Sequence, residues 1–208
     1  MYFDVTSMIQ RARELLKSNI TSFLISGIII SFFDLAMFII WVYIEEFYQM
    51  VLFGLLVLIL HTFFMTSLIW YATKLSHEQL TSKTDLFAAF SEKQMKVILI
   101  GLIKGLSVFF GIFLLYIGAL IPLYCFRFAE NLLMDEEQIT VFGALKKSTV
   151  LLKGHFWDLV KLDIRMIGWW SLYYFTSGLA GIYVLPFATL VYTEFYDFLK
   201  AQNETIRS

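Results

Sequence analysis

Ionisable side chains inside otherwise apolar segments are the residues of this sequence most able to do chemistry. We expect six of them to form an intramembrane polar cluster: Asp34, Lys104, Arg127, Glu130, Asp163 and Arg165. A charged side chain at the centre of a membrane helix costs about 2.5–3.5 kcal/mol on translocon scales, so it persists where it pairs or faces water. The cluster therefore predicts either a polar cleft for a proton, an ion or a charged substrate, or buried ion pairs that hold the helices in register.

The spacing of these residues indicates which of them can meet. Arg127 and Glu130 are three residues apart, so on one helix they share a face and can pair. Asp34 and Lys104 are candidates to pair across helices, with each other or with Arg127 and Glu130. His61 is the only ionisable group in its apolar segment, and we predict that it is a hydrogen-bonded packing residue rather than a proton relay.

A second group of charges follows the segment that begins at Trp157. Asp158, Lys161 and Arg165 share one helical face, whereas Asp163 points elsewhere. We expect Asp158 and Lys161 to lie at a cytoplasmic entrance, where long side chains reach the headgroups. Arg165 is deeper in this segment and therefore needs a partner.

These charges must be positioned by segments long enough to cross a membrane, which requires about 20 mostly apolar residues. The sequence predicts six spans, of which the fourth is short: Ile20–Ile44, Phe47–Tyr71, Val97–Ala119, Leu120–Met134, Trp157–Thr176 and Leu179–Leu199. The predicted fold class is therefore all-α, a polytopic membrane protein with six transmembrane helices arranged as three hairpins.

Composition supports this class. Hydrophobic residues make up 59% of the 208 residues and charged residues 16%, against about 45–50% and 25% in soluble domains. These values exclude a soluble single domain and a disordered chain. The net charge of −1 argues against nucleic acid as a partner, and the single Cys125 excludes an internal disulfide and a multi-cysteine metal site.

The basic residues predict the orientation of the six spans. Four of the 16 Lys and Arg residues lie inside spans, and the other 12 fall on one side: Arg11, Arg13, Lys17, Lys74, Lys83, Lys93, Lys96, Lys146, Lys147, Lys153, Lys200 and Arg207. Basic residues concentrate in cytoplasmic loops. We therefore expect both termini to be cytoplasmic.

The chain is predicted to be one membrane domain, residues 1–208, with three similar units at 1–79, 80–137 and 138–208. Each unit begins with an amphipathic interfacial segment, such as Val5–Leu16 and Thr84–Lys93, and Leu15–Asn19 matches Leu151–His155. The alternative is that Leu-Leu-Lys before a span is a common interfacial pattern. We expect six residues to lie at the lipid interface, as topological anchors or as sensors of anionic lipid: Arg11, Arg13, Lys17, Lys146, Lys147 and Lys153.

Signatures of the major enzyme classes are absent from the sequence, since it has neither a His-Glu-x-x-His helix nor a phosphate-binding loop nor a Gly-x-Ser-x-Gly elbow. We therefore expect a protein that is not an enzyme and that needs no metal or cofactor. Gly101 and Gly105 form a Gly-x-x-x-Gly pair, which favours close helix packing.

Three stretches of the sequence carry a recognisable pattern: Met8–Asn19, the segment from Ala144 to Trp170, and Pro186 with Thr193–Tyr196. They resemble the start, the central signature and the end of an uncharacterised family of bacterial membrane proteins, domain-of-unknown-function family 975. The sequence Ile121-Pro122-Leu123 departs from the family's usual Pro-Gly. The resemblance implies a six-span protein of the bacterial cytoplasmic (inner) membrane without assigned catalytic residues.

Two functions fit these observations best. The first is a small transport, export or immunity component for a peptide, a lipid or an amphipathic compound. The alternative is a non-catalytic scaffold or regulator that binds another membrane protein or lipid. The expected partners are membrane lipids, together with a second copy of the chain or another membrane protein.

Overall fold

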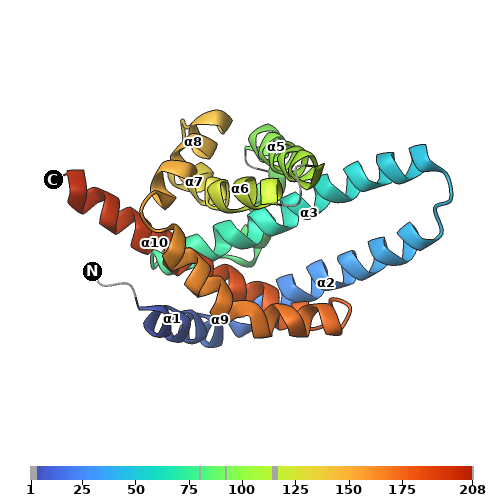
Figure 1. Ribbon diagram of the computed structural model, residues 1–208. Coiled ribbons are helices and arrows are strands. Elements are labelled where there is room, and N and C mark those ends of the chain that lie inside the picture. Colours follow the sequence, from blue (N-terminus) through green and yellow to red (C-terminus); the bar gives the residue numbers. More distant parts are fainter. Residues whose placement is uncertain (1–3, 80, 92, 114–116, 208) are drawn as a thin grey trace.

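The computed structural model describes residues 4–79, 81–91, 93–113 and 117–207, and every regular element among them is a helix (Figure 1). The elements are α1 Val5–Ser18, α2 Ile20–Val42, α3 Phe47–Ser76, the 3-10 helix η1 Lys83–Phe87, α4 Ala88–Ser91, α5 Gln94–Phe113, α6 Ile117–Cys125, α7 Ala129–Asp135, α8 Val141–Leu152, α9 Phe156–Phe175 and α10 Gly181–Arg207. The predicted all-α class is thereby confirmed.

Helices α2 and α3 form a long hairpin that projects from the rest of the molecule (Figure 1). Within the described residues, Ile20–Val42 and Tyr48–Ser76 are the two helices both long and apolar enough to cross a membrane. Only 28% and 22% of their most apolar stretches are buried. Exposed apolar surface on this scale suggests a membrane protein. Two of the six predicted spans meet the length and hydropathy criteria for crossing a membrane in the described residues, so the six-span topology is not confirmed.

The fourth predicted span is not one continuous helix. It is divided into α6 and α7 by a turn at residues 126–128. Two hydrogen bonds from Ser148 on α8 stabilise this break. The Ser148 hydroxyl donates to the carbonyl oxygen of Cys125 at 2.7 Å and accepts from the backbone N–H of Phe128 at 3.2 Å. One side chain thus replaces main-chain hydrogen bonds that a continuous helix would make.

Helix α10 is the centre of the fold and packs on α1, α2, α3, α8 and α9. Its residues from Val184 to Leu199 are buried except for Tyr192 and Asp197, which are half-buried. The backbones of α2 and α10 cross closely, and a Cβ atom on Gly27 would overlap with the carbonyl group of Ile182.

Helix α5 approaches α3 through the two glycines of the Gly-x-x-x-Gly pair. A Cβ on Gly101 would lie 2.5 Å from the Thr62 hydroxyl, and one on Gly105 would lie 2.7 Å from a Leu58 methyl group. The predicted role of this pair in close helix packing is therefore confirmed.

The predicted amphipathic segments adopt different structures. Helix α1 forms as expected, is capped by the Asp4 side chain and buries Met8, Ala12 and Leu16. Thr84–Lys93 is not a single helix, because the chain there consists of η1, which Ser82 caps, followed by the short α4. Helix α8 precedes α9, as α1 precedes α2.

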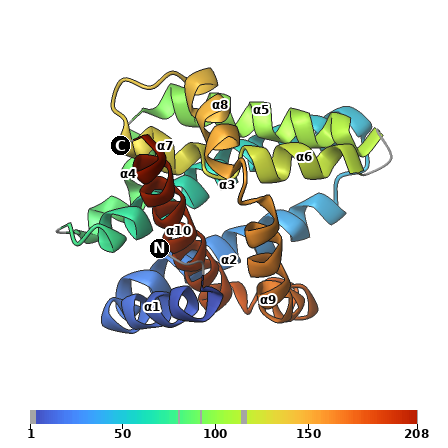
Figure 2. The same ribbon diagram turned by 60° about the vertical axis from the view of Figure 1, so that its left-hand side comes forward.

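Both chain ends lie at one end of the molecule. The turns after α2 and after α9 lie at the opposite end (Figure 1), and the turned view in Figure 2 shows α5 and α6 running side by side toward that same region.

Candidate functional site

A cavity of about 220 Å³ lies among α3, α5, α7, α9 and α10. Its polar wall combines two cations, one carboxylate, an amide and two aromatic side chains: Lys104, Arg127, Glu130, Asn131, Trp170 and Tyr192. Three members of the predicted polar cluster therefore line one cavity. Its apolar wall includes Met65 and Ile69 of α3.

Lys104 and Glu130 form the first ion pair of this cavity, with 2.6 Å between Nζ and Oε1. The Glu130 side chain is 7% exposed and that of Lys104 26%. The indole N–H of Trp70 donates to the Glu130 backbone carbonyl at 2.9 Å and fixes this part of α7. Among the described residues, Glu130 Oε2 and Thr193 Oγ1 are buried without a hydrogen-bond partner. Both residues line the cavity.

Arg127 does not pair with Glu130, contrary to the prediction. Because Arg127 lies in the turn between α6 and α7, the helical spacing on which that pairing depended is interrupted. Its guanidinium lies 3.6 Å from Asp163 of α9 and stacks 3.7 Å above the ring of Tyr192. The Tyr192 hydroxyl donates to Asp163 at 2.6 Å, and the indole N–H of Trp170 donates to that hydroxyl at 3.4 Å.

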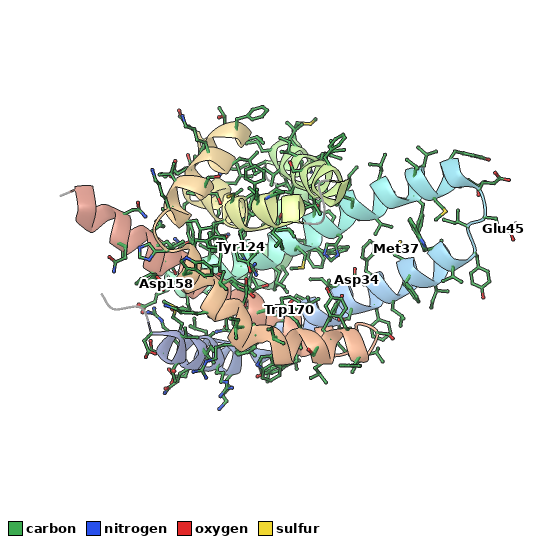
Figure 3. The ribbon with its side chains drawn as sticks, in the orientation of Figure 1. Asp34, Met37, Glu45, Tyr124, Asp158 and Trp170 are labelled. Atoms are coloured by element: carbon green, nitrogen blue, oxygen red, sulfur yellow. The ribbon has the colours of Figure 1, made fainter. Side chains whose placement is uncertain are left out.

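Asp34 lies apart from this cavity. Its carboxylate contacts His61 Nδ1 of α3 at 3.0 Å and accepts a hydrogen bond from the Tyr173 hydroxyl of α9 at 3.3 Å. The prediction that His61 is hydrogen-bonded is confirmed, whereas Asp34 does not meet Lys104. Figure 3 shows Asp34 on α2, on the way to the turn that holds Glu45, while Trp170 is nearer the middle of the molecule.

A second and wider cavity of about 530 Å³ opens beside this pair, between α2 and α3. Apart from Asp34 and His61 its lining is apolar, and it includes Trp41, Phe53 and Val57. The hydrogen-bonded Asp34 and His61 side chains and the apolar walls together make an amphipathic groove within the hairpin.

The charges at the start of α9 pair with their near neighbours, and their place at a cytoplasmic entrance stays a prediction. Asp158 bonds Lys161 at 3.2 Å and His155 Nδ1 at 3.0 Å, near the end of the molecule that carries the termini (Figure 3). Arg165 is exposed and makes no ion pair with any residue that the structure describes. The partner that its depth in the segment was predicted to require is therefore not found in the described chain.

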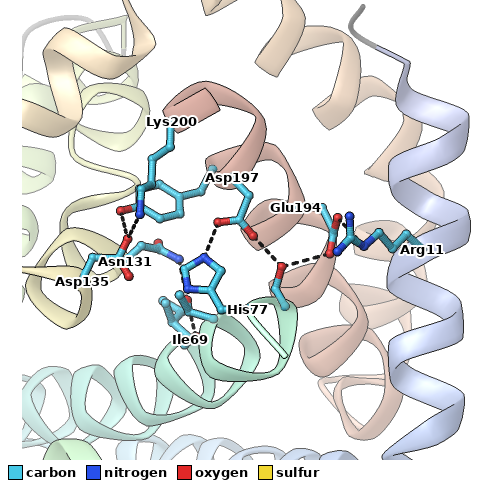
Figure 4. A network of polar contacts seen from close by, with 11 residues as sticks. Arg11, Ile69, His77, Asn131, Asp135, Glu194, Asp197 and Lys200 are labelled. Atoms are coloured by element: carbon cyan, nitrogen blue, oxygen red, sulfur yellow. Dashed lines mark hydrogen bonds and ion pairs between the residues drawn. The ribbon is translucent and has the colours of Figure 1, made fainter. Parts of the chain in front are cut away.

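A polar network that the sequence did not reveal joins α1, α3 and α10 (Figure 4). Arg11 contacts Glu194 at 3.3 Å, and the Ser76 hydroxyl, with its single proton, lies 3.2 Å from Glu194 Oε1 and 2.5 Å from Asp197 Oδ2. His77 Nε2 contacts Asp197 at 2.8 Å. The i, i+3 spacing of the two α10 carboxylates was the available signal, but their partners are more than 100 positions away in the sequence.

The same figure shows a second group where α7 meets α10. Asp135 accepts from the Tyr196 hydroxyl and from Lys200, each at 2.6 Å. Asn131 donates to the Thr73 hydroxyl of α3 at 3.1 Å. Polar contacts are therefore found from the end of the molecule that carries the termini as far as Asn131, which follows Glu130 in the sequence.

The predicted lipid-interface residues are distributed as follows. Arg13, Lys17, Lys146 and Lys153 are exposed. Arg11 and Lys147 also make ion pairs within the protein, with Glu194 and Glu136. Their role toward lipid remains a prediction.

The cavity holds its charges as pairs, and two of its lining residues, Glu130 and Thr193, each carry a buried oxygen atom without a hydrogen-bond partner among the described residues. Within the described chain, no group of three or more His, Cys, Asp or Glu side chains could hold a metal ion. Paired charges and unpartnered oxygen atoms are groups that can bind a small polar or charged ligand by hydrogen bonds and electrostatics.

Comparison with known proteins gives one match. No curated protein and no solved structure matches the chain. Residues 115–203 match the family described as Protein of unknown function (DUF975), a region that contains Arg127, Glu130, Asp163, Trp170 and Tyr192. This match covers the central and C-terminal motifs of the resemblance seen in the sequence, but not Met8–Asn19, and it supports membership of the chain in the DUF975 family.

Proposed function

We propose that the protein is a six-span component of the bacterial cytoplasmic membrane that transports or exports a peptide, a lipid or an amphipathic compound, or confers immunity to one. The single observation that carries this proposal is the cavity lined by Lys104, Arg127 and Glu130 in the interior of the helix bundle. Charges that served only to hold helices together would leave neither a cavity between them nor a buried carboxylate oxygen without a partner.

The helix lengths support six crossings. Helices α5 and α9 each have 20 residues, which at 1.5 Å per residue extend about 30 Å, the thickness of the hydrocarbon core. Helix α10 has 27 residues. Helices α6 and α7 together would form the fourth crossing, interrupted at Arg127. Broken helices are tolerated at membrane depth where they are buried in protein or line a cavity, and this break does line one.

The charge distribution supports an orientation with both termini in the cytoplasm. The turns after α2 and after α9, residues 43–46 and 176–180, contain no Lys or Arg. They lie at the end of the molecule opposite to the termini (Figure 1). Basic residues favour the cytoplasmic side, so the end that carries the termini would face the cytoplasm.

In this proposal the cavity receives the polar part of the compound while its apolar part stays against the hydrocarbon or the apolar helix faces. Lys104 and Arg127 retain 26% and 25% of their side-chain surface. A ligand can therefore approach these cations without first separating the helices.

A survival assay tests the proposal. A susceptible bacterium that expresses the wild-type chain is challenged with membrane-active peptides, lysolipids and cationic amphiphiles. We expect the wild type to raise the inhibitory concentration of at least one class, and Glu130→Gln and Arg127→Gln to abolish the gain at unchanged protein level. Glu137→Gln, the same change at an exposed carboxylate, should behave as wild type. Protection by Glu130→Gln equal to wild type would refute a transport role for this cavity.

The groove between α2 and α3 favours a second candidate, a scaffold that binds another membrane protein. Its apolar walls and exposed aromatic residues, Trp41 among them, could receive a helix of a partner. A native-mass measurement in mild detergent tests this alternative, since a scaffold should purify as a complex or an oligomer. A monomer that retains protection in the survival assay would exclude it.

A further inference from the structure

We propose that the cavity recognises a zwitterion, with the protonated primary amine of the ligand on Glu130 and its anionic group on Arg127. This inference rests on the proposed function and names the chemical class of its ligand. Two sources carry this chemistry, the ethanolamine phosphate headgroup of a lipid and a free amino acid or short peptide.

The acceptor side of the cavity calls for an N–H donor. Glu130 is more than nine-tenths buried, and Lys104 satisfies only its Oε1 atom. Glu130 Oε2 and Thr193 Oγ1 are buried in the same cavity without partners among the described residues. A buried carboxylate oxygen without a hydrogen bond is costly. An ammonium group offers three N–H donors, which is the chemistry that such an acceptor lacks.

The donor side of the cavity calls for an anion. A guanidinium has five N–H donors in a planar fork that matches phosphate and carboxylate groups. Within the described chain, Arg127 has a single ion pair, a 3.6 Å contact with Asp163. Stacking on Tyr192 fixes the plane of the guanidinium. Its remaining donors are therefore oriented and available for a ligand.

Charge balance favours a zwitterion over a simple ion. The two cations Lys104 and Arg127 are already matched by Glu130 and Asp163. A ligand with net charge would leave an uncompensated charge in a low-dielectric site, whereas a zwitterion preserves neutrality. The volume of about 220 Å³ is below the roughly 300–1,000 Å³ of sites that bury drug-sized ligands. The site therefore fits a headgroup or a small molecule, not a whole lipid.

Ligand-induced thermal stabilisation of the purified full chain tests the proposal. The probes are glycerophosphoethanolamine, glycerophosphocholine and glycerophosphoglycerol, which share the phosphate but differ in the amine, and glycylglycine as the free zwitterion. Glycerophosphocholine is the critical comparison, because its quaternary ammonium has no N–H donor. We expect the ethanolamine form to raise Tm by about 2–4 °C and the choline and glycerol forms to leave it unchanged. The response to glycylglycine decides between the two sources.

Matched variants place the effect at Glu130. Glu130→Gln should remove the shift, whereas Glu137→Gln should keep it. If Glu130→Gln fails to fold, Thr193→Val removes the second acceptor and should weaken the response. Equal shifts with ethanolamine and choline, or a full shift in Glu130→Gln, would overturn amine recognition.

The two proposals fail separately. Absence of any shift with all four probes, combined with protection that depends on Glu130 in the survival assay, would overturn the zwitterion and retain transport. Absence of protection combined with an ethanolamine-specific shift would retain the binding site and overturn transport.

Discussion

Ser148 on α8 completes the main-chain hydrogen bonding of the broken α6–α7 segment by donating to the carbonyl oxygen of Cys125 at 2.7 Å. The same hydroxyl accepts from the Phe128 N–H. Arg127 lies between these two bonded residues, so the contact that holds the break also positions the guanidinium at the cavity. A residue outside the cavity thus determines part of its geometry.

Ser148→Ala should destabilise the protein by about 1–3 kcal/mol, because it leaves the buried Phe128 N–H without its acceptor. The Cys125 carbonyl keeps a longer hydrogen bond from the Thr149 hydroxyl at 3.4 Å, so we expect the lower part of this range. Chemical unfolding in detergent measures this loss. Ser171→Ala on α9 is the control, since Ser171 is half-buried without a hydrogen bond to its side chain among those described. Equal stability of the two variants would show that the break is held by other contacts.

The long apolar elements of the fold could be predicted from the sequence, and the break could not. Helices α2 and α9 begin and end within two residues of the predicted spans. Their boundaries were predictable because each helix covers one long apolar segment, whose first and last residues can be read from the sequence. The break at residues 126–128 is bridged by hydrogen bonds of Ser148, 20 positions away from Phe128. A local pattern does not contain that contact.

The candidate site was predictable to a similar extent. The pairing of Lys104 with Glu130 was among the predicted alternatives, because charges at membrane depth must find a partner. The pairing of Arg127 with Asp163 was not, since it follows from the break. The network around Ser76 and Glu194 requires the three-dimensional arrangement of α3 and α10.

Removal of the cation from the Lys104–Glu130 pair should be more harmful than removal of the anion. Lys104→Met leaves a carboxylate that is 93% buried without a cation, and loss of one partner from a buried pair costs about 3–5 kcal/mol. We expect a loss at or below the lower end, because Lys104 is partly exposed. Glu130→Gln retains an acceptor for the Lys104 ammonium and should cost less.

A double-mutant cycle isolates this interaction. The double variant Lys104→Met/Glu130→Gln should recover part of the stability that Lys104→Met loses, since it no longer buries an unpaired charge. Lys146→Met, at an exposed lysine, controls for the loss of a positive charge as such. Additive effects of the two substitutions would mean that the pair contributes nothing beyond its separate residues.

Gly27→Ala should destabilise the crossing of α2 and α10. The added Cβ would overlap with the backbone of Ile182, which cannot move without shifting α10. Overpacking of this kind costs typically about 1–3 kcal/mol. Gly168→Ala on α9 is the matched control, because a Cβ there meets nothing within 4 Å and alanine is the better helix former by about 0.8–1.0 kcal/mol. In thermal unfolding, Gly27→Ala should therefore lower Tm relative to wild type and Gly168→Ala should raise it.

The contact between Lys74 of α3 and Asp85 of η1 should make the anchoring of η1 dependent on pH. Burial of Asp85 acts to raise its pKa, but the hydrogen bonds from Lys74 at 2.9 Å and from the Ser82 N–H outweigh burial and hold the pKa below the usual 3.8. A carboxyl group whose pKa is lower in the folded state stabilises that state above its unfolded pKa, and this stabilisation is lost as the pH falls through the folded pKa.

We therefore expect η1 to be protected at pH 5 to 7 and to loosen below about pH 3.8. Limited proteolysis of the segment between α3 and α5, compared across pH with an acid-stable protease, measures this change. Asp85→Asn removes the titrating group, so its cleavage should already be raised at neutral pH and should vary less with pH. A wild-type profile that matches that of Asp85→Asn would show that the ion pair does not anchor η1 to α3.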